Sequence, residues 1–150
     1  DISLEDTMNK FSGKNFSEFK ENLSQVTVGK ICPISSEIKK FIESNPDTVL
    51  LDVRTEDEWN TVGKPNTKDL GIKSFFITIS QDQGFLEIVK KNIDKKKQVL
   101  VMCAAGGRSI IAANLLAKEG YNTLNVSDGF SGNNQDPGWK NLGLPSIIDN

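Results

Sequence analysis

The chain has 150 residues, of which 37% are hydrophobic and 25% are charged, and these values are typical of a soluble globular protein. This length suits one domain that is large enough to bury most of its apolar surface. The net charge of −2 gives no basic footprint for nucleic acid or acidic membranes. No apolar run approaches the roughly 20 residues of a membrane span.

The content of histidine and cysteine narrows the possible chemistry. The sequence contains no histidine, which excludes Ser-His-Asp triads, Cys-His proteases and histidine-ligated metal sites. The two cysteines, Cys32 and Cys103, are too few for a zinc site and too far apart for a C-x-x-C redox pair. A disulfide between them is disfavoured, because a domain of this size does not need one. We therefore expect neither a metal nor a cofactor.

The first part of the chain divides into an extension and the start of the domain. Residues 1–25 are polar and lysine-rich, with apolar side chains near helical spacing, so this extension either packs on the domain as a helix or is loosely held. Residues 26–150 form the domain, which begins with a short strand at 26–31. A helix should follow with Ser35 or Ser36 as its N-cap.

Strands and helices then alternate along the chain. The pattern predicts strands at 48–53, 72–79, 98–102 and 121–126, and helices at 56–60, 85–93 and 107–119. Residues 63–66 are typical of a turn, and the tail from Asp128 is expected to be anchored by Trp139 and Leu142. This alternation predicts an α/β fold with a parallel sheet covered by helices on both faces.

The most informative stretch is the thiol loop, residues 103–109, which follows the strand at 98–102. It consists of Cys103, Ala104, Ala105, Gly106, Gly107, Arg108 and Ser109. In a parallel sheet, ligands bind beyond the carboxyl ends of the strands. The small loop residues and the helix start can direct peptide N–H groups at the Cys103 sulfur and stabilise its anion. Arg108 offers a charged fork to an oxyanion.

The two cysteines receive different interpretations. Cys103 is the predicted nucleophile, because strand, small loop, Arg-Ser pair and helix stand in order around it. A core cysteine at a strand end is the simpler alternative for a thiol of this kind. Cys32 has no such loop and is interpreted as structural.

Here the chain resembles the rhodanese-like sulfurtransferase family, single-domain thiosulfate sulfurtransferases among them. The thiol loop is similar to the family motif C-x-x-G-x-R-S. The segment from Leu51 to Trp59 resembles the D-V-R-x-x-x-E-(aromatic) signature, and Gly138 to Pro145 resembles the G-W-x-x-x-G-(L/Y)-P ending. The resemblance spans about residues 34–146 in the right order. It implies one rhodanese-like domain with five parallel strands flanked by helices.

The resemblance also implies a two-step sulfur transfer. Cys103 would take a sulfane sulfur from a small donor such as thiosulfate and pass the persulfide sulfur to a thiol, to cyanide or to an acceptor protein. Residues 104–109 would bind the substrate anion, with Arg108 as the anion-binding side chain. Asp52 and Arg54 would support the site. Arg54 and Glu58, four residues apart, are expected to form a structural ion pair.

Two departures from the family pattern bear on the donor. The usual G-H-(I/V)-x-G-A segment is replaced by residues 63–67, Gly-Lys-Pro-Asn-Thr. Ala104 and Ala105 stand where charged or polar residues are often found. Arg108 is then the fixed charge within the loop, and a thiol persulfide or a protein partner suits the site as well as thiosulfate.

Two other functions compete with sulfur transfer. A cysteine-dependent phosphatase is disfavoured because the related phosphatases have five residues between Cys and Arg, whereas this loop has four. A rhodanese-like binding or sensing module with little turnover is disfavoured because Cys103 and Arg108 are both present. We expect a monomer or weak dimer in the cytoplasm, or in the periplasm if a signal peptide has been removed before Asp1.

Overall fold

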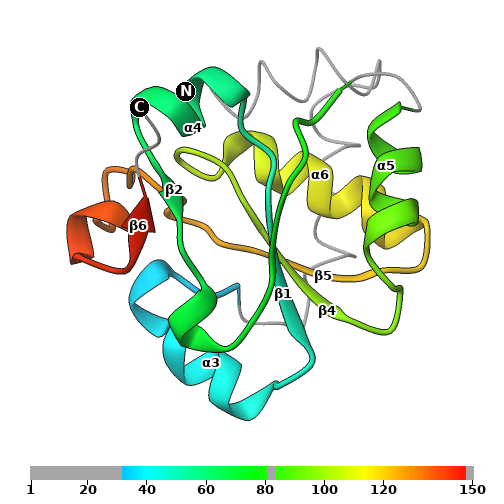
Figure 1. Ribbon diagram of the computed structural model, residues 1–150, viewed down its shortest axis with the longest axis horizontal. Coiled ribbons are helices and arrows are strands. Elements are labelled where there is room, and N and C mark those ends of the chain that lie inside the picture. Colours follow the sequence, from blue (N-terminus) through cyan, green and yellow to red (C-terminus); the bar gives the residue numbers. More distant parts are fainter. Residues whose placement is uncertain (1–31, 81–83, 148–150) are drawn as a thin grey trace.

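The computed structural model describes residues 32–80 and 84–147 (Figure 1). In chain order its elements are η1 (Ser35–Glu37), α3 (Ile38–Ser44), β1 (Thr48–Asp52), α4 (Glu56–Thr61), β2 (Lys64–Pro65), η2 (Lys68–Leu70), β3 (Ser74–Phe76), α5 (Gly84–Asn92), β4 (Gln98–Met102), α6 (Gly107–Lys118), β5 (Asn122–Asn125), η3 (Lys140–Leu142) and β6 (Ser146–Ile147). The extension at 1–25 and the strand at 26–31 lie outside the described residues.

Within the residues that the structure describes, the main sheet has four parallel strands in the order β3-β1-β4-β5. Four of the five predicted strands are therefore present, and the fifth falls on residues 26–31. Asp52, the last residue of β1, pairs with Met102, the last residue of β4. The two central strands thus end at the same edge, and the segments that follow them meet there.

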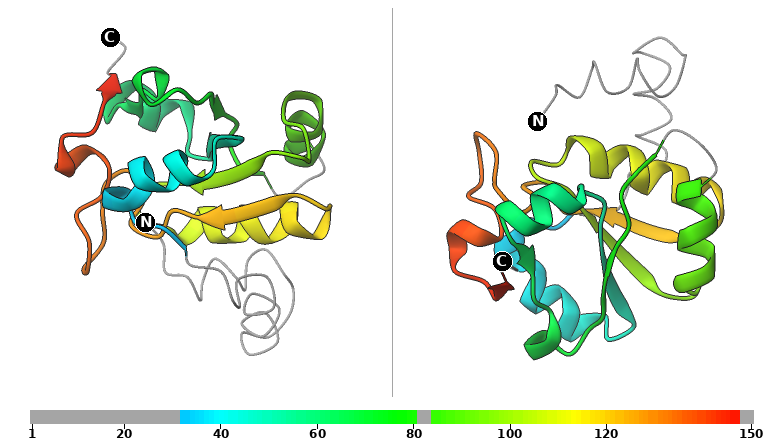
Figure 2. Two further views of the ribbon diagram at one scale, coloured as in Figure 1. Left: turned by 90° about the horizontal axis from the view of Figure 1, so that it is seen from below. Right: turned by 45° about the horizontal axis from the view of Figure 1, so that its top comes forward.

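The strands alternate their side chains between two apolar cores. On one face, Val99 and Val101 of β4 pack in a cluster that includes residues of α5 and α6. On the other face, Leu100 and Met102 pack with residues of α3 and with Trp139 from the tail. Figure 2 shows α3 and α6 on opposite sides of the sheet. This confirms the predicted arrangement of helices on both faces of a parallel sheet.

Several local expectations were wrong. Neither Ser35 nor Ser36 caps a helix; Ser35 begins η1 and α3 follows with Glu37 as its N-cap. The strand predicted at 72–79 is confined to Ser74–Phe76. The predicted turn at 63–66 contains β2, which pairs antiparallel with β6 in a small second sheet.

The tail is tied to the start of the domain by a buried carboxylate. Asp128 is fully buried and accepts hydrogen bonds from Ser35 N at 2.8 Å, Ser35 Oγ at 2.9 Å and Gly138 N at 3.0 Å. The Ser35 hydroxyl therefore serves this tertiary contact, which explains why it caps no helix. Trp139 is fully buried as predicted, but Leu142 is 40% exposed and belongs to neither apolar core.

Candidate active site

Cys103 follows directly after β4 and faces the same apolar core as Val99 and Val101. This placement follows from the alternation of side chains along a strand, since positions 99, 101 and 103 share one face. The thiol lies where β4 gives way to the loop that starts α6. The structure thus puts the predicted nucleophile at the carboxyl end of a central strand.

The sulfur is surrounded by donors as well as by aliphatic groups. The Gly106 amide donates a hydrogen bond to Cys103 Sγ at 3.1 Å, and Ser109 Oγ lies 3.3 Å from the same sulfur. Gly106 has a φ of +99°, a left-handed conformation that turns its N–H back toward the strand end. A side chain at this position would also collide with the Ser127 carbonyl oxygen. Glycine is therefore required here by both conformation and space.

Ser109 connects the sulfur to the neighbouring strand. Its single hydroxyl proton can be donated to Asn125 Oδ1, 2.5 Å away at the end of β5, or to the sulfur. Asn125 Nδ2 in turn donates to the Gly106 carbonyl at 3.4 Å. Ser109 and Asn125 are both buried. The two side chains hold the first turn of α6 against β5 and fix the hydroxyl beside the sulfur. Asn125 was not predicted as a site residue, because a polar residue that ends a buried strand has no periodic signature.

Arg108 is held by a carboxylate from α4. Its Nη1 and Nη2 donate to Glu58 Oε1 at 2.6 Å and to Oε2 at 2.9 Å. These hydrogen bonds lower the pKa of Glu58 to about 2 and raise the pKa of Arg108. Both groups therefore stay charged across the range in which a thiol enzyme operates.

The expected ion pair between Arg54 and Glu58 is absent, and Arg54 pairs with Asp52 instead. Arg54 Nε lies 3.0 Å from Asp52 Oδ1, and Nη2 lies 2.8 Å from Oδ2. The i, i+4 rule failed because Arg54 precedes α4, which begins at Glu56, so the two residues do not share a helix face. Asp52 is two residues away along the chain, and its carboxylate lies within hydrogen-bonding distance of the guanidinium.

The Asp52–Arg54 pair packs against Phe130. Both charged side chains are fully buried, and the Arg54 guanidinium lies 4.3 Å from the centre of the Phe130 ring. Phe130 N donates to the Cys103 carbonyl at 2.8 Å. The buried ion pair thus packs against the residue that fixes the backbone of the nucleophile. The supporting role of Asp52 and Arg54 stays a prediction.

The tail segment 129–131 closes over the start of the thiol loop. Ser131 N donates to the Ala104 carbonyl at 2.9 Å, beside the contact from Phe130. Gly129 has a φ of +64°, and a Cβ there would press on the carbonyl oxygens of Cys103 and Ala104. The loop is therefore clamped from a segment far away in sequence.

The thiol lies directly beneath the loop surface. Cys103 is fully buried, whereas Ala104, Ala105, Gly107 and Arg108 are partly exposed. The sulfur itself is therefore closed off from solvent in this structure. Cys32 is also a free thiol and is partly exposed. Its structural role stays a prediction.

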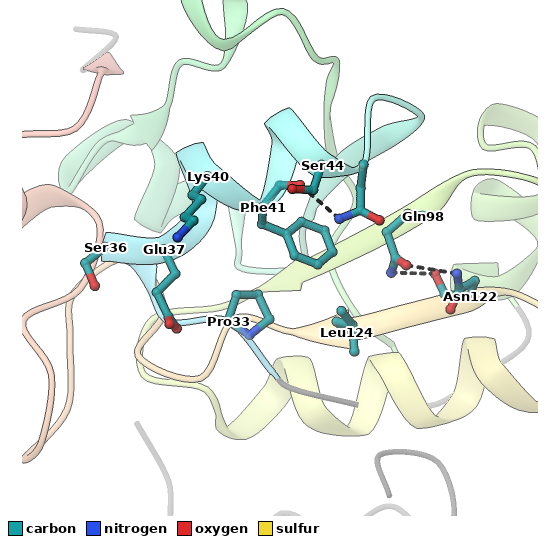
Figure 3. A pocket seen from close by; sticks show the side chains of 10 residues that line it. Pro33, Ser36, Glu37, Lys40, Phe41, Ser44, Gln98, Asn122 and Leu124 are labelled. Carbon is teal, nitrogen blue, oxygen red and sulfur yellow. Dashed lines mark hydrogen bonds between the residues drawn. The ribbon is translucent and has the colours of Figure 1, made fainter. Parts of the chain in front are cut away.

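A groove of about 700 Å³ lies elsewhere on the molecule, between α3 and β5 (Figure 3). Phe41 and Leu124 line its apolar part, and Gln98 and Asn122 hydrogen bond to each other at one end. Gln98 is the first residue of β4, whereas Cys103 follows the last. The groove therefore extends toward the opposite end of the strand from the sulfur.

The fold and the loop together define a class of protein: a parallel α/β domain that carries one cysteine beyond a central strand, in a loop that begins a helix. A family model described as "Rhodanese-like domain" matches residues 35–136. The chain belongs to the rhodanese-like family.

Among the described residues, no helix has the length and apolar character needed to cross a membrane.

Individual proteins agree with this assignment. The chain is 40% identical to the uncharacterized protein RP600 of Rickettsia prowazekii over 123 residues, 79% of this chain and 96% of that protein. The crystal structure of Rv0390 from M. tuberculosis has a TM-score of 0.67 and 29% identity, covering 78% of this chain and 96% of that one. The polysulfide-sulfur transferase of Wolinella succinogenes has a TM-score of 0.61 and 25% identity, covering 95% and 93%. The domain therefore has a sulfurtransferase-type fold.

Proposed function

We propose that the protein is a sulfurtransferase that carries sulfane sulfur as a persulfide on Cys103. The observation that carries this proposal is the setting of the sulfur: an amide N–H at 3.1 Å and a hydroxyl at 3.3 Å, at the start of α6. Donors at a helix start favour a negative charge on the sulfur in both its thiolate and its persulfide form. The likeness to a polysulfide-sulfur transferase supports the same chemistry.

In the first step the Cys103 thiolate attacks the sulfane sulfur of the donor. A new S–S bond forms to Cys103, the donor S–S bond breaks, and the leaving group keeps the bonding electrons, as sulfite does when thiosulfate is the donor. In the second step a thiolate or cyanide attacks the outer sulfur and regenerates the Cys103 thiolate. This divides one transfer between two covalent steps. Peptide dipoles of the loop stabilise the anion in each.

The experiment is mass spectrometry of the protein after incubation with thiosulfate, with polysulfide and with a thiol persulfide. We expect a gain of one sulfur atom on the peptide that contains Cys103, and no gain in the Cys103→Ala variant. Cys32→Ser is the matched control, since it removes the other thiol and should keep the gain. Release of thiocyanate on addition of cyanide would demonstrate the second step.

Two outcomes would replace this proposal. No sulfur gain from any donor would favour a binding or sensing module, for which the full burial of Cys103 is the supporting observation. Hydrolysis of an aryl phosphate that disappears in Cys103→Ser would favour a phosphatase.

We propose a small sulfur donor and a thiol, cyanide or protein acceptor as partners.

A further inference from the structure

The charge of the thiol loop is controlled from outside the loop. Glu58 binds Arg108 through both carboxylate oxygens, and the two side chains are only 27% and 18% exposed. Thr55, the N-cap of α4, donates to Glu58 Oε1 from its backbone N at 3.3 Å and from Oγ1 at 3.1 Å. The capping box thus fixes the carboxylate in position before any donor arrives.

This pairing removes the net charge that the loop would otherwise present. Positions 104–107 are Ala, Ala, Gly and Gly, so Arg108 is the loop residue with a formal positive charge. Its guanidinium is matched by one carboxylate in a fork-to-fork geometry. Attraction for an anionic donor is then left to peptide dipoles, which supply partial charges only.

A donor oxyanion also has to compete with Glu58. Two of the five N–H groups of the guanidinium already bind the carboxylate in the bidentate geometry that an oxyanion would use. A donor that approaches Arg108 meets the negative charge of Glu58 as well. The resulting repulsion grows in proportion to the charge of the donor, because an electrostatic potential acts on each unit of charge.

We propose, on the basis of the sulfur transfer proposed above, that Glu58 determines the charge specificity of the site. By pairing with Arg108 it disfavours sulfane donors with two negative charges and favours donors with one charge or none. The family signature contains this glutamate. Its spacing of four residues from Arg54 predicted Arg54 as its partner, whereas its partner in the structure is Arg108.

Two donors of nearly the same shape isolate the effect of charge. Thiosulfate is a dianion, and the methanethiosulfonate anion replaces one of its oxygens by a methyl group and carries one charge. The Cys103 thiolate breaks the same S–S bond in each and forms the same persulfide. The leaving groups are sulfite and methanesulfinate. Because their intrinsic reactivities differ, the diagnostic quantity is the change in the ratio of the two rates on mutation.

The test compares wild type with Glu58→Gln, which keeps an oxygen acceptor for Arg108 but removes the charge. The second-order rate constant for persulfide formation is measured by quenched-flow mass spectrometry at low ionic strength. We expect the rate constant to rise about tenfold with thiosulfate and about threefold with methanethiosulfonate. The electrostatic free energy is proportional to the donor charge, so its change for the dianion is twice that for the monoanion. The gains should shrink as salt is added.

Glu56→Gln is the matched control. Glu56 is exposed in the first turn of the same helix, so this variant changes the net charge of the protein equally without touching Arg108. It should leave the ratio of the two rates unchanged. Thermal unfolding of each variant checks that the domain is intact.

The outcomes separate the two proposals. Equal changes with both donors in Glu58→Gln, or a change in ratio that Glu56→Gln reproduces, would overturn the role of Glu58 and leave sulfur transfer standing. The absence of a persulfide with either donor, in wild type and variant, would overturn both. A ratio that shifts only in Glu58→Gln supports the assignment.

Discussion

Replacing Asp52 by asparagine should destabilise the domain severely while leaving its shape almost unchanged. Both Asp52 and Arg54 are fully buried, and three contacts of 3.1 Å or less join the Arg54 side chain to the Asp52 carboxylate. An amide at position 52 removes the counter-charge and turns one acceptor into a donor that faces the guanidinium. The arginine is then left with an uncompensated charge in the interior.

The expected loss can be estimated from the contacts that survive. Removing one partner of a buried ion pair costs about 3–5 kcal/mol. Arg54 would keep the Gly63 carbonyl at 2.9 Å and the Phe130 ring at 4.3 Å, which places the loss near the lower end, about 3 kcal/mol. For a chain of this length that corresponds to a fall in Tm of roughly 6–12 °C.

The assay is urea unfolding followed by circular dichroism, together with a thermal scan. Asp47→Asn is the exposed control, because Asp47 faces Lys97 at 3.8 Å with 84% of its side chain in solvent, and it should leave Tm almost unchanged. The double variant Asp52→Asn, Arg54→Met removes both charges and should be more stable than Asp52→Asn alone. A loss under about 1 kcal/mol in the single variant, or a double variant less stable than it, would refute the reasoning.

Three further predictions concern the thiol loop and its supports. Ser109→Ala removes the hydroxyl that lies 3.3 Å from Cys103 Sγ and should slow persulfide formation about tenfold. The rate is measured by quenched-flow mass spectrometry. An unchanged rate would mean that this hydroxyl does not stabilise the sulfur anion. Gly129→Ala should lower Tm more than Gly143→Ala. Both positions have a positive φ, but only at position 129 would a Cβ meet the carbonyl oxygens of Cys103 and Ala104. Equal losses of Tm would show that the tight packing of segment 129–131 on the thiol loop does not contribute to stability. The pKa of Glu58 is depressed to about 2 from an ordinary 4.5, so its contribution to stability is complete above about pH 4.5 and is lost as the pH falls toward 2. Urea unfolding should therefore show wild type losing more stability than Glu58→Gln across that window, and parallel losses would argue against the ion pair.

The elements near the sulfur were predictable because their signals are local. Residues 99–102 form a continuous apolar run, and β4 covers them together with Gln98. The helix after the loop was expected to end near Gly120, and it ends at Lys118 with Gly120 at a φ of +95°. The order of strand, small loop and helix follows from these signals. This order predicts that Cys103 lies at the carboxyl edge of the sheet, where the structure has it.

The partners of the charged residues were not predictable from spacing. Glu58 faces Arg108, which is 50 positions away, because α4 and the start of α6 meet at the same edge of the sheet. Ser35 binds Asp128 across 93 positions. Such pairs form because the tertiary fold brings distant segments together. A periodicity of 2 or 3.6 residues in the sequence reports only local structure and does not predict them. The exposure of Leu142 has a similar origin, since the tail follows no regular period.

The clamp on the loop also has a consequence for the order in which the molecule is built. Phe130 and Ser131 hold the carbonyls of Cys103 and Ala104, and Trp139 N in turn donates to the Gly129 carbonyl at 3.0 Å. A nascent chain that has just emerged as far as the cysteine therefore lacks the segment that seals the sulfur in place. The reactive centre is completed only after residues 129–139 have been synthesised, when the four strands of the main sheet already exist to shelter it.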